Sequence, residues 1–147
     1  MSGFGLRGMV SLSFLVSLFV MGGGVMSAGA APLVAKVDLS SQRMSVYVNG
    51  KKRYSWSIAS GKKGWRTPTG RFTPITTYRS RYVKRWNMTL PYAVVLTSGG
   101  IAVHGSSGPM GTPRSHGCIR LSVPNAAKFY NLVGKYGKWG TKVTVQH

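Results

Sequence analysis

The sequence predicts a mainly β domain, built as a sandwich or a barrel-like sheet, with one short helix at about 123–133. Three observations lead to this fold class. Short segments in which apolar and polar side chains alternate recur along the chain, which is typical of strands with one buried face. Turn residues separate these segments, and Asn49-Gly50 is the strongest hairpin signal among them. Only one stretch repeats apolar residues at helical spacing, so sheets must supply most of the core.

The alternating segments predict the strands in chain order. Asn49-Gly50 joins two of them into a hairpin, Pro68-Thr69-Gly70 forms a turn before the next, and Ser98-Gly99-Gly100 joins another pair. The predicted strands cover residues 33–39, 43–49, 52–59, 71–77, 92–97, 101–104 and 142–146.

The single helix is predicted from its ends as well as from its spacing. Ser122 is suited to cap its N-terminus, and Pro124 suits the first turn, where the missing N–H is not needed. Gly134 is expected to end the helix. The apolar positions between these ends recur at helical spacing, and they are Val123, Ala126, Ala127, Tyr130 and Val133.

Length and charge narrow the possible functions. With 147 residues the chain has room for one domain and hardly for two. Lys and Arg number 20 against one acidic residue, Asp38, and the formal net charge is +19. One carboxylate excludes hydrolysis by a carboxylate pair, metal sites built from carboxylates, and a catalytic triad oriented by any acid other than Asp38. The one cysteine, Cys118, excludes an internal disulfide and a four-cysteine zinc site.

The N-terminal residues have the layout of a secretory signal peptide. Arg7 precedes an apolar run at 9–20, three glycines break the run, and the small residues Ala28-Gly29-Ala30 follow. We expect residues 1–30 to be a cleaved signal peptide and residues 31–147 to be a single exported domain in the periplasm or cell wall. An uncleaved membrane anchor is the alternative, although the run is shorter than a bilayer-spanning helix requires.

The candidate chemistry lies around the only cysteine. A thiol becomes a nucleophile when it loses its proton, and the nearby His104 and His116 can accept that proton. Gly117 permits a sharp turn that can direct backbone N–H groups at a developing oxyanion. An inert buried Cys118 is one alternative. A Cys/His metal site is another, and the close spacing of His116 and Cys118 disfavours it, so we expect no metal.

These residues carry a resemblance to a known family. Ser115-His116-Gly117-Cys118-Ile119-Arg120-Leu121 and the upstream His104-Gly105 resemble the motifs of the L,D-transpeptidase catalytic domain of the YkuD type. Segments 37–47 and 66–72 also match, so the resemblance covers about residues 34–146 and implies the L,D-transpeptidase catalytic fold.

The resemblance also implies a role for each residue of these motifs. Cys118 matches the nucleophile and His104 the base, whereas His116, Gly117 and Cys118 match the turn whose N–H groups form the oxyanion hole. His116 is also expected to orient the loop. Ser115 matches the motif's hydroxyl residue, and Arg120 is suited to a substrate carboxylate. Gly105 stands where some branches have Ser, so a backbone carbonyl is expected to orient His104 instead. The loop between His104 and Ser115 is shorter than in many members.

The implied activity is transfer of a peptidoglycan tetrapeptide stem through a Cys118 thioester. The acceptor is a second stem, which gives a 3→3 crosslink, or an envelope lipoprotein or outer-membrane protein. Water as acceptor would make the protein an L,D-carboxypeptidase, and a non-catalytic basic wall-binding module is a further alternative. The resemblance implies no cofactor, a role in cell-wall organisation and cell shape, and acylation of Cys118 by carbapenems.

Basic and aromatic residues are mixed in three segments, at 51–53, 62–66 and 79–86. Such a surface is typical of nucleic-acid binding, but export makes nucleic acid an unsuitable partner. We expect the charge to attract the anionic envelope surface, and a merely solvated basic face is the alternative. One or more of the aromatic side chains before the site is expected to line the donor-peptide groove, with ordinary packing as the alternative, and the candidates are Tyr78, Tyr82, Trp86 and Tyr92.

Overall fold

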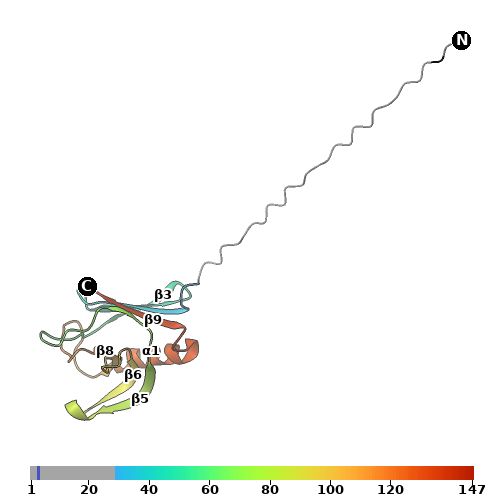
Figure 1. Cartoon of the computed structure of the whole chain (residues 1–147). Coiled ribbons are helices and arrows are strands. Elements are labelled where there is room, and N and C mark those ends of the chain that lie inside the picture. Colours follow the sequence, from blue (N-terminus) through green and yellow to red (C-terminus); the bar gives the residue numbers. More distant parts are fainter. Residues whose placement is uncertain (1–2, 4–28) are drawn as a thin grey trace.

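A computed structural model of the chain describes Gly3 and residues 29–147 (Figure 1). The predicted signal peptide therefore lies almost entirely outside the described residues. Two sheets stack on each other, and each remains open at its edges. The sandwich is thus confirmed, whereas the barrel-like alternative is wrong, because neither sheet closes on itself. Among the described residues, no helix is long and apolar enough to cross a bilayer.

The first sheet has the order β3-β2-β1-β9-β4. Its strands are β1 (Leu33–Asp38), β2 (Arg43–Val48), β3 (Lys51–Ser57), β4 (Gly70–Phe72) and β9 (Thr141–Gln146). The predicted hairpin of β2 and β3 forms around Asn49-Gly50, and both turn residues have positive φ angles. β9 pairs in parallel with β1, so the last strand lies inside the sheet between β1 and β4.

The second sheet has the order β5-β6-β7-β8 and carries the candidate site. Its strands are β5 (Thr76–Val83), β6 (Met88–Val95), β7 (Ala102–Ser106) and β8 (Ile119–Ser122). β5 and β6 form a long hairpin, and the short 3-10 helix η1 (Lys84–Trp86) lies at its tip. β7 and β8 pair in parallel.

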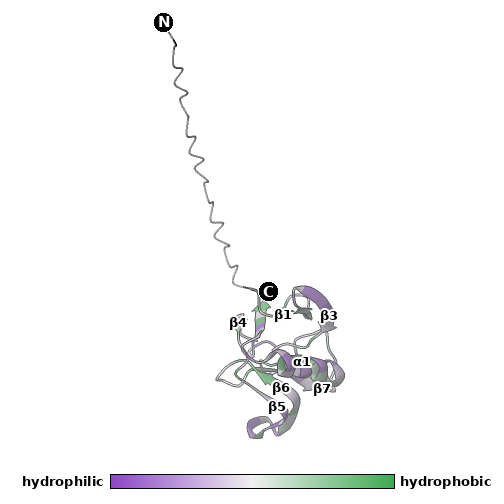
Figure 2. Ribbon diagram, turned by 90° about the vertical axis from the view of Figure 1, so that its right-hand side faces the viewer, coloured by the Kyte–Doolittle hydropathy of each residue, from purple (hydrophilic) through white to green (hydrophobic). Residues whose placement is uncertain are grey.

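Both sheets and the helix contribute to one core. Alternate residues of β1, β2 and β9 face inward, which explains the alternation in the sequence. Figure 2 shows hydrophilic colour along β3 and the tip of the β5–β6 hairpin, and hydrophobic colour along β6. The largest fully buried side chains are Phe129, Leu33, Met44, Ile58, Ile119 and Leu121.

The helix α1 (Val123–Tyr136) starts where the sequence predicts and ends later. Ser122 Oγ accepts a hydrogen bond from the Asn125 N–H at 3.4 Å, which confirms the cap. The prediction that Gly134 ends the helix is wrong, because the helix continues to Tyr136 and Gly137 closes it with a φ of 77°. The Gly137 N–H donates to the Val133 carbonyl at 2.8 Å, which satisfies the last turn.

Two further strand predictions need correction. The extended segment predicted at 71–77 is divided, because β4 ends at Phe72 in the first sheet and β5 begins at Thr76 in the second. Pro74 lies between them and has no N–H to continue a ladder. β8 was not predicted as a strand, because it is only four residues long and follows the Gly-rich motif directly.

Gly134 provides a test of the helix. It lies within α1, is exposed, and has open space where a Cβ would be added. Gly134→Ala is therefore expected to raise the free energy of unfolding by about 0.5–1 kcal/mol, because alanine loses less backbone entropy in a helix. Chemical denaturation measures the change. The matched control is Gly137→Ala, which must place a Cβ at a φ of 77° and should lower stability by about 1–2 kcal/mol. Equal effects of the two substitutions would contradict the observed helix end.

Candidate active site

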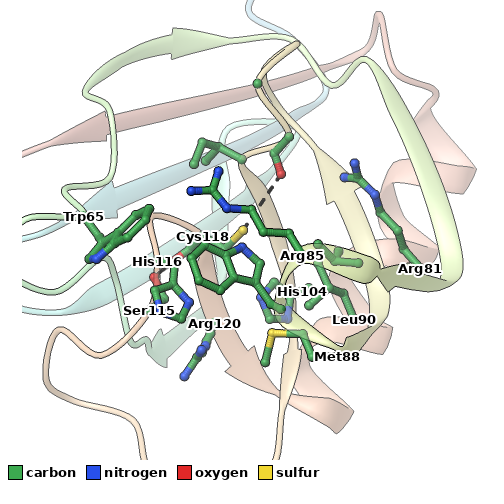
Figure 3. A pocket seen from close by; sticks show the side chains of 15 residues that line it. Trp65, Arg81, Arg85, Met88, Leu90, His104, Ser115, His116, Cys118 and Arg120 are labelled. Carbon is green, nitrogen blue, oxygen red and sulfur yellow. Dashed lines mark hydrogen bonds between the residues drawn. The ribbon is translucent and has the colours of Figure 1, made fainter.

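A pocket of about 400 Å³ lies between the β5–β6 hairpin, the Gly99-Gly100 turn and the loop that carries Cys118 (Figure 3). Five of the seven residues singled out in the sequence line it, namely His104, Ser115, His116, Cys118 and Arg120. Gly105 and Gly117 lie behind this lining. The described residues hold no group of three or more His, Cys, Asp or Glu side chains that could bind a metal ion.

His104 is held inside the second sheet by its place on β7. Val103 faces the core, so the next side chain faces the opposite way, into the pocket. His104 Nδ1 lies 2.8 Å from the Gly105 carbonyl oxygen, which can only accept a hydrogen bond. Nδ1 must therefore carry the proton, and Nε2 keeps a free lone pair. The expected backbone carbonyl in place of an acidic partner is thus present.

Gly105 is needed for a second reason. A Cβ at this position would lie 3.1 Å from the Val123 Cα and 3.3 Å from the Ala126 Cβ, both in α1. A side chain at this position would therefore crowd the helix against β7. Gly105 thus orients His104 through its carbonyl group. Its lack of a side chain also leaves room for the helix.

Burial sets the protonation states of the two candidate catalytic groups. His104 is 3% exposed, and burial lowers its pKa to about 4, with a smaller contribution from the charge of Arg120. Burial raises the pKa of the Cys118 thiol, while a backbone hydrogen bond from Ala102 and the charges of Arg120 and Arg81 act in the opposite direction. At neutral pH the pair is therefore a neutral thiol beside a neutral imidazole, rather than a thiolate–imidazolium ion pair.

Parallel pairing brings these two groups together. His104 lies opposite Arg120 in the β7–β8 ladder, and Cys118 lies just before β8 begins. His104, in the middle of β7, and Cys118, just before β8, are thus held on neighbouring strands although they lie 14 positions apart in the chain. The Cys118 Sγ lies 4.0 Å from the Gly100 carbonyl oxygen, at the rim of the pocket (Figure 3).

The loop before Cys118 is closed by Ser115. Its hydroxyl donates to the Cys118 carbonyl at 2.5 Å and accepts from the Gly117 N–H at 3.0 Å. Gly117 has a φ of 117°, and a Cβ there would lie 2.7 Å from Ile101 Cδ1, so only glycine fits. Since Ser115 occupies the Gly117 N–H, the N–H groups of His116 and Cys118 remain as the candidate oxyanion donors.

Thr67 is a positioning residue that the sequence did not single out. Its side chain is 4% exposed and bridges two loops, donating to the Gly117 carbonyl at 2.8 Å and accepting from the Gly61 N–H at 2.9 Å. The Ser60 carbonyl accepts from the N–H groups of Arg114 and Ser115, and the Gln42 side chain in turn holds Ser60. The only sequence signal for Thr67 was the match of segment 66–72 to the family.

Aromatic rings form one wall of the pocket. Trp86 stacks on His116 with ring centroids 3.9 Å apart and an interplanar angle of 4°, and Trp65 contacts His116 edge-on at 5.1 Å. Arg85 lies over the Trp86 ring at 4.9 Å. Partial burial, aided by nearby cations, lowers the pKa of His116. His116 therefore packs as part of the pocket wall.

Only one of the four aromatic candidates lines the pocket. Trp86 does so, whereas Tyr78 and Tyr82 are exposed. Tyr92 packs against Tyr130 of the helix with ring centroids 5.6 Å apart. Trp65 also lines the pocket, although it had been noted only as part of a basic segment.

Comparison with known proteins identifies the architecture. The family model of the YkuD L,D-transpeptidase catalytic domain matches residues 32–145. An L,D-transpeptidase from Mycobacterium smegmatis is 28% identical with a TM-score of 0.73, and the match covers 80% of this chain and 59% of that one. An L,D-transpeptidase from Mycobacterium tuberculosis H37Rv is 26% identical with a TM-score of 0.70, over 79% of this chain and 58% of that one.

A third solved structure is an L,D-transpeptidase in complex with imipenem. It is 26% identical with a TM-score of 0.72, over 78% of this chain and 59% of that one. The present chain thus spans about three fifths of the length of these solved chains. A comparison with curated proteins gives no match.

The neutral pair predicts how Cys118 responds to pH. The rate of alkylation by iodoacetamide, followed by intact mass, is expected to keep rising through pH 9, because burial raises the thiol pKa and His104 is too weak a base to hold the proton at rest. Cys118→Ser removes the only thiol, so it measures the background alkylation of other side chains. A constant rate between pH 5 and 8 would instead demonstrate a preformed ion pair.

Proposed function

The chain belongs to the L,D-transpeptidase catalytic domain family, and from that premise we propose that it is an exported enzyme that transfers peptidoglycan tetrapeptide stems through a thioester on Cys118. One observation carries the proposal. A half-buried thiol just before β8 and an imidazole with a free Nε2 on the neighbouring strand β7 line the same pocket. This arrangement supplies a nucleophile and a base without any carboxylate.

In the first step Cys118 attacks the carbonyl carbon at the L-centre of diaminopimelate. The sulfur–carbon bond forms while His104 Nε2 takes the thiol proton, because the resting pair is neutral. Negative charge develops on the carbonyl oxygen, where the N–H groups of His116 and Cys118 can stabilise it. The carbon–nitrogen bond then breaks, His104 returns its proton to the leaving amine, and the terminal D-Ala departs. A thioester remains on Cys118.

In the second step an amine attacks the thioester. His104 takes a proton from the incoming amine, the carbon–sulfur bond breaks, and the Cys118 sulfur regains a proton. A diaminopimelate side chain as acceptor gives a 3→3 crosslink, and an amine of an envelope lipoprotein or outer-membrane protein gives a covalent attachment. The openness of the site to water makes L,D-carboxypeptidase activity the second candidate, with the same residues and water in place of the amine.

The reaction products test this function. The protein is incubated with a disaccharide-tetrapeptide, and the products are analysed by mass spectrometry. Dimers formed with loss of D-Ala are expected, and Cys118→Ala should abolish them because the thioester cannot form. Acylation by imipenem, seen as a mass increase that is absent in the variant, reports the nucleophile separately. Monomers that have lost D-Ala would establish hydrolysis instead. If the wild-type protein formed neither product, a non-catalytic binding module would be the remaining alternative.

We further propose that the surface charge retains the domain on the anionic envelope. The single carboxylate cannot neutralise the many cations, and Asp38 already accepts hydrogen bonds from the N–H and hydroxyl of Ser40, at 2.9 and 2.6 Å. These bonds, with those of Ser41, lower the pKa of Asp38 to about 2. Exposed cations such as Lys51, Lys52 and Arg53 therefore face solvent and any anionic surface.

Retention of this kind predicts release by salt. Protein bound to isolated wall sacculi should dissociate as sodium chloride rises from about 0.05 to 1 M, because the Debye length falls to about 3 Å. Sedimentation followed by gel densitometry measures the bound fraction. Cys118→Ala should release in the same way, since the attraction does not involve the thioester. Binding that is independent of salt would contradict this role for the charge.

A further inference from the structure

The pocket contains guanidinium groups that the protein leaves without anionic partners. Arg81, Arg85 and Arg120 line it, and no carboxylate does. Arg85 is placed against the rings of Trp86 and Trp65, at 4.9 and 5.8 Å, so its charge already has favourable contacts. Arg81 also lies over a ring, that of Tyr78 at 5.6 Å, but Arg81 and Arg120 each have a buried nitrogen without any hydrogen-bond partner among the described residues, Nη1 in Arg81 and Nε in Arg120.

Such unpaired nitrogens point to a ligand. Buried donors of charged groups ordinarily have a hydrogen-bond partner, because a buried donor without one destabilises the folded protein. Guanidinium groups match carboxylates in charge and in the spacing of their donors. A substrate that brings carboxylates into this pocket would therefore supply what the protein lacks. Arg120 already has this expected role from its motif, whereas Arg81 has no assigned role.

Arg81 reaches the pocket from β5, whereas the base reaches it from β7. Arg81 pairs with Leu90 in the β5–β6 hairpin, and both side chains line the pocket. Its Nη2 lies 3.5 Å from the position that a Cβ on Gly100 would occupy, and the Gly100 carbonyl oxygen lies 4.0 Å from the Cys118 sulfur. Arg120, by contrast, lies opposite His104 in the β7–β8 ladder. Figure 3 shows Arg81 to the right of Cys118 and Arg120 below it, in different parts of the pocket.

We propose that Arg81 binds a carboxylate on the retained half of the donor peptide, while Arg120 binds the carboxylate of the residue that leaves. The assignment rests on the proposed function. His104 must return its proton to the leaving amine, so the leaving residue lies on the side of His104 and Arg120. The retained diaminopimelate then extends toward Arg81, and its side chain ends in a centre that carries a second carboxylate.

Arg81 also influences the thiol, because its charge favours the thiolate of Cys118. If this charge effect were the only role of Arg81, its loss would lower the reaction rate with every donor by the same factor. Recognition of a carboxylate would instead change the preference between donors that differ only in that group. Arg81 is in this sense a specificity-determining residue, and the ratio of two rates separates the two effects.

Two disaccharide-tetrapeptide donors test the assignment, one with the distal diaminopimelate carboxylate free and one with it converted to the carboxamide. The full-length protein is expected to favour the free acid in kcat/KM by about tenfold or more, mainly through KM, as a charge-assisted hydrogen bond implies. Arg81→Gln should reduce this preference to about one while still turning over both donors.

Two control variants remove the same charge elsewhere. Arg79→Gln changes an exposed residue of the same strand that does not line the pocket, and it should keep the wild-type preference. Arg120→Gln should lower activity on both donors and still favour the free acid, because it acts on the leaving side. Circular dichroism and thermal unfolding of each variant establish that the fold is intact.

Each possible result either supports or overturns the assignment of Arg81. A preference that disappears only in Arg81→Gln supports the assignment. Equal rates for the two donors in the wild-type protein, or a preference that survives Arg81→Gln, would overturn it while leaving the transpeptidase function in place. Failure of the wild-type protein to process either donor would overturn the proposed function and the assignment together.

Discussion

The parallel pairing of β7 with β8 is the constraint on which the site depends. It places His104 opposite Arg120 and holds Cys118 just before β8, although His104 precedes Cys118 by 14 positions and Arg120 by 16. β7 is largely buried, so the pairing also removes the base from water, whereas the Cys118 thiol is half-buried. The low pKa of His104 and the raised pKa of Cys118 follow from that burial. Geometry and protonation state thus have one structural origin.

The remaining polar groups of the site act through the loop. Ser115 closes the turn, Thr67 and Ser60 attach it to the segment after β3, and the ring of His116 rests against Trp86. None of these contacts requires a carboxylate. His104 also needs no carboxylate. The Gly105 carbonyl fixes its tautomer, a role that an aspartate has in the serine protease triad. A chain with one acidic residue can therefore still orient a catalytic imidazole.

The parts of this structure that local patterns determine could be predicted from the sequence. β1, the β2–β3 hairpin and the start of α1 have an alternation, a turn or a cap of their own. Two features could not be predicted from the sequence, because tertiary contacts decide them. They are the division of 71–77 between two sheets and the extension of α1 past Gly134. His104 and Cys118 were found through a motif, whereas Thr67, Trp65 and Arg81 belong to the site only because distant segments meet there.

The position of β9 has a consequence for how the chain acquires its structure. Residues 141–146 lie between β1 and β4, so the first sheet has a gap in its interior until they arrive. Translation runs from the N-terminus, so residues 141–146 are made after β1 and β4, and a nascent chain lacking them exposes the unpaired edges of these two strands. The order of synthesis therefore delays completion of the first sheet until its most C-terminal strand has been made.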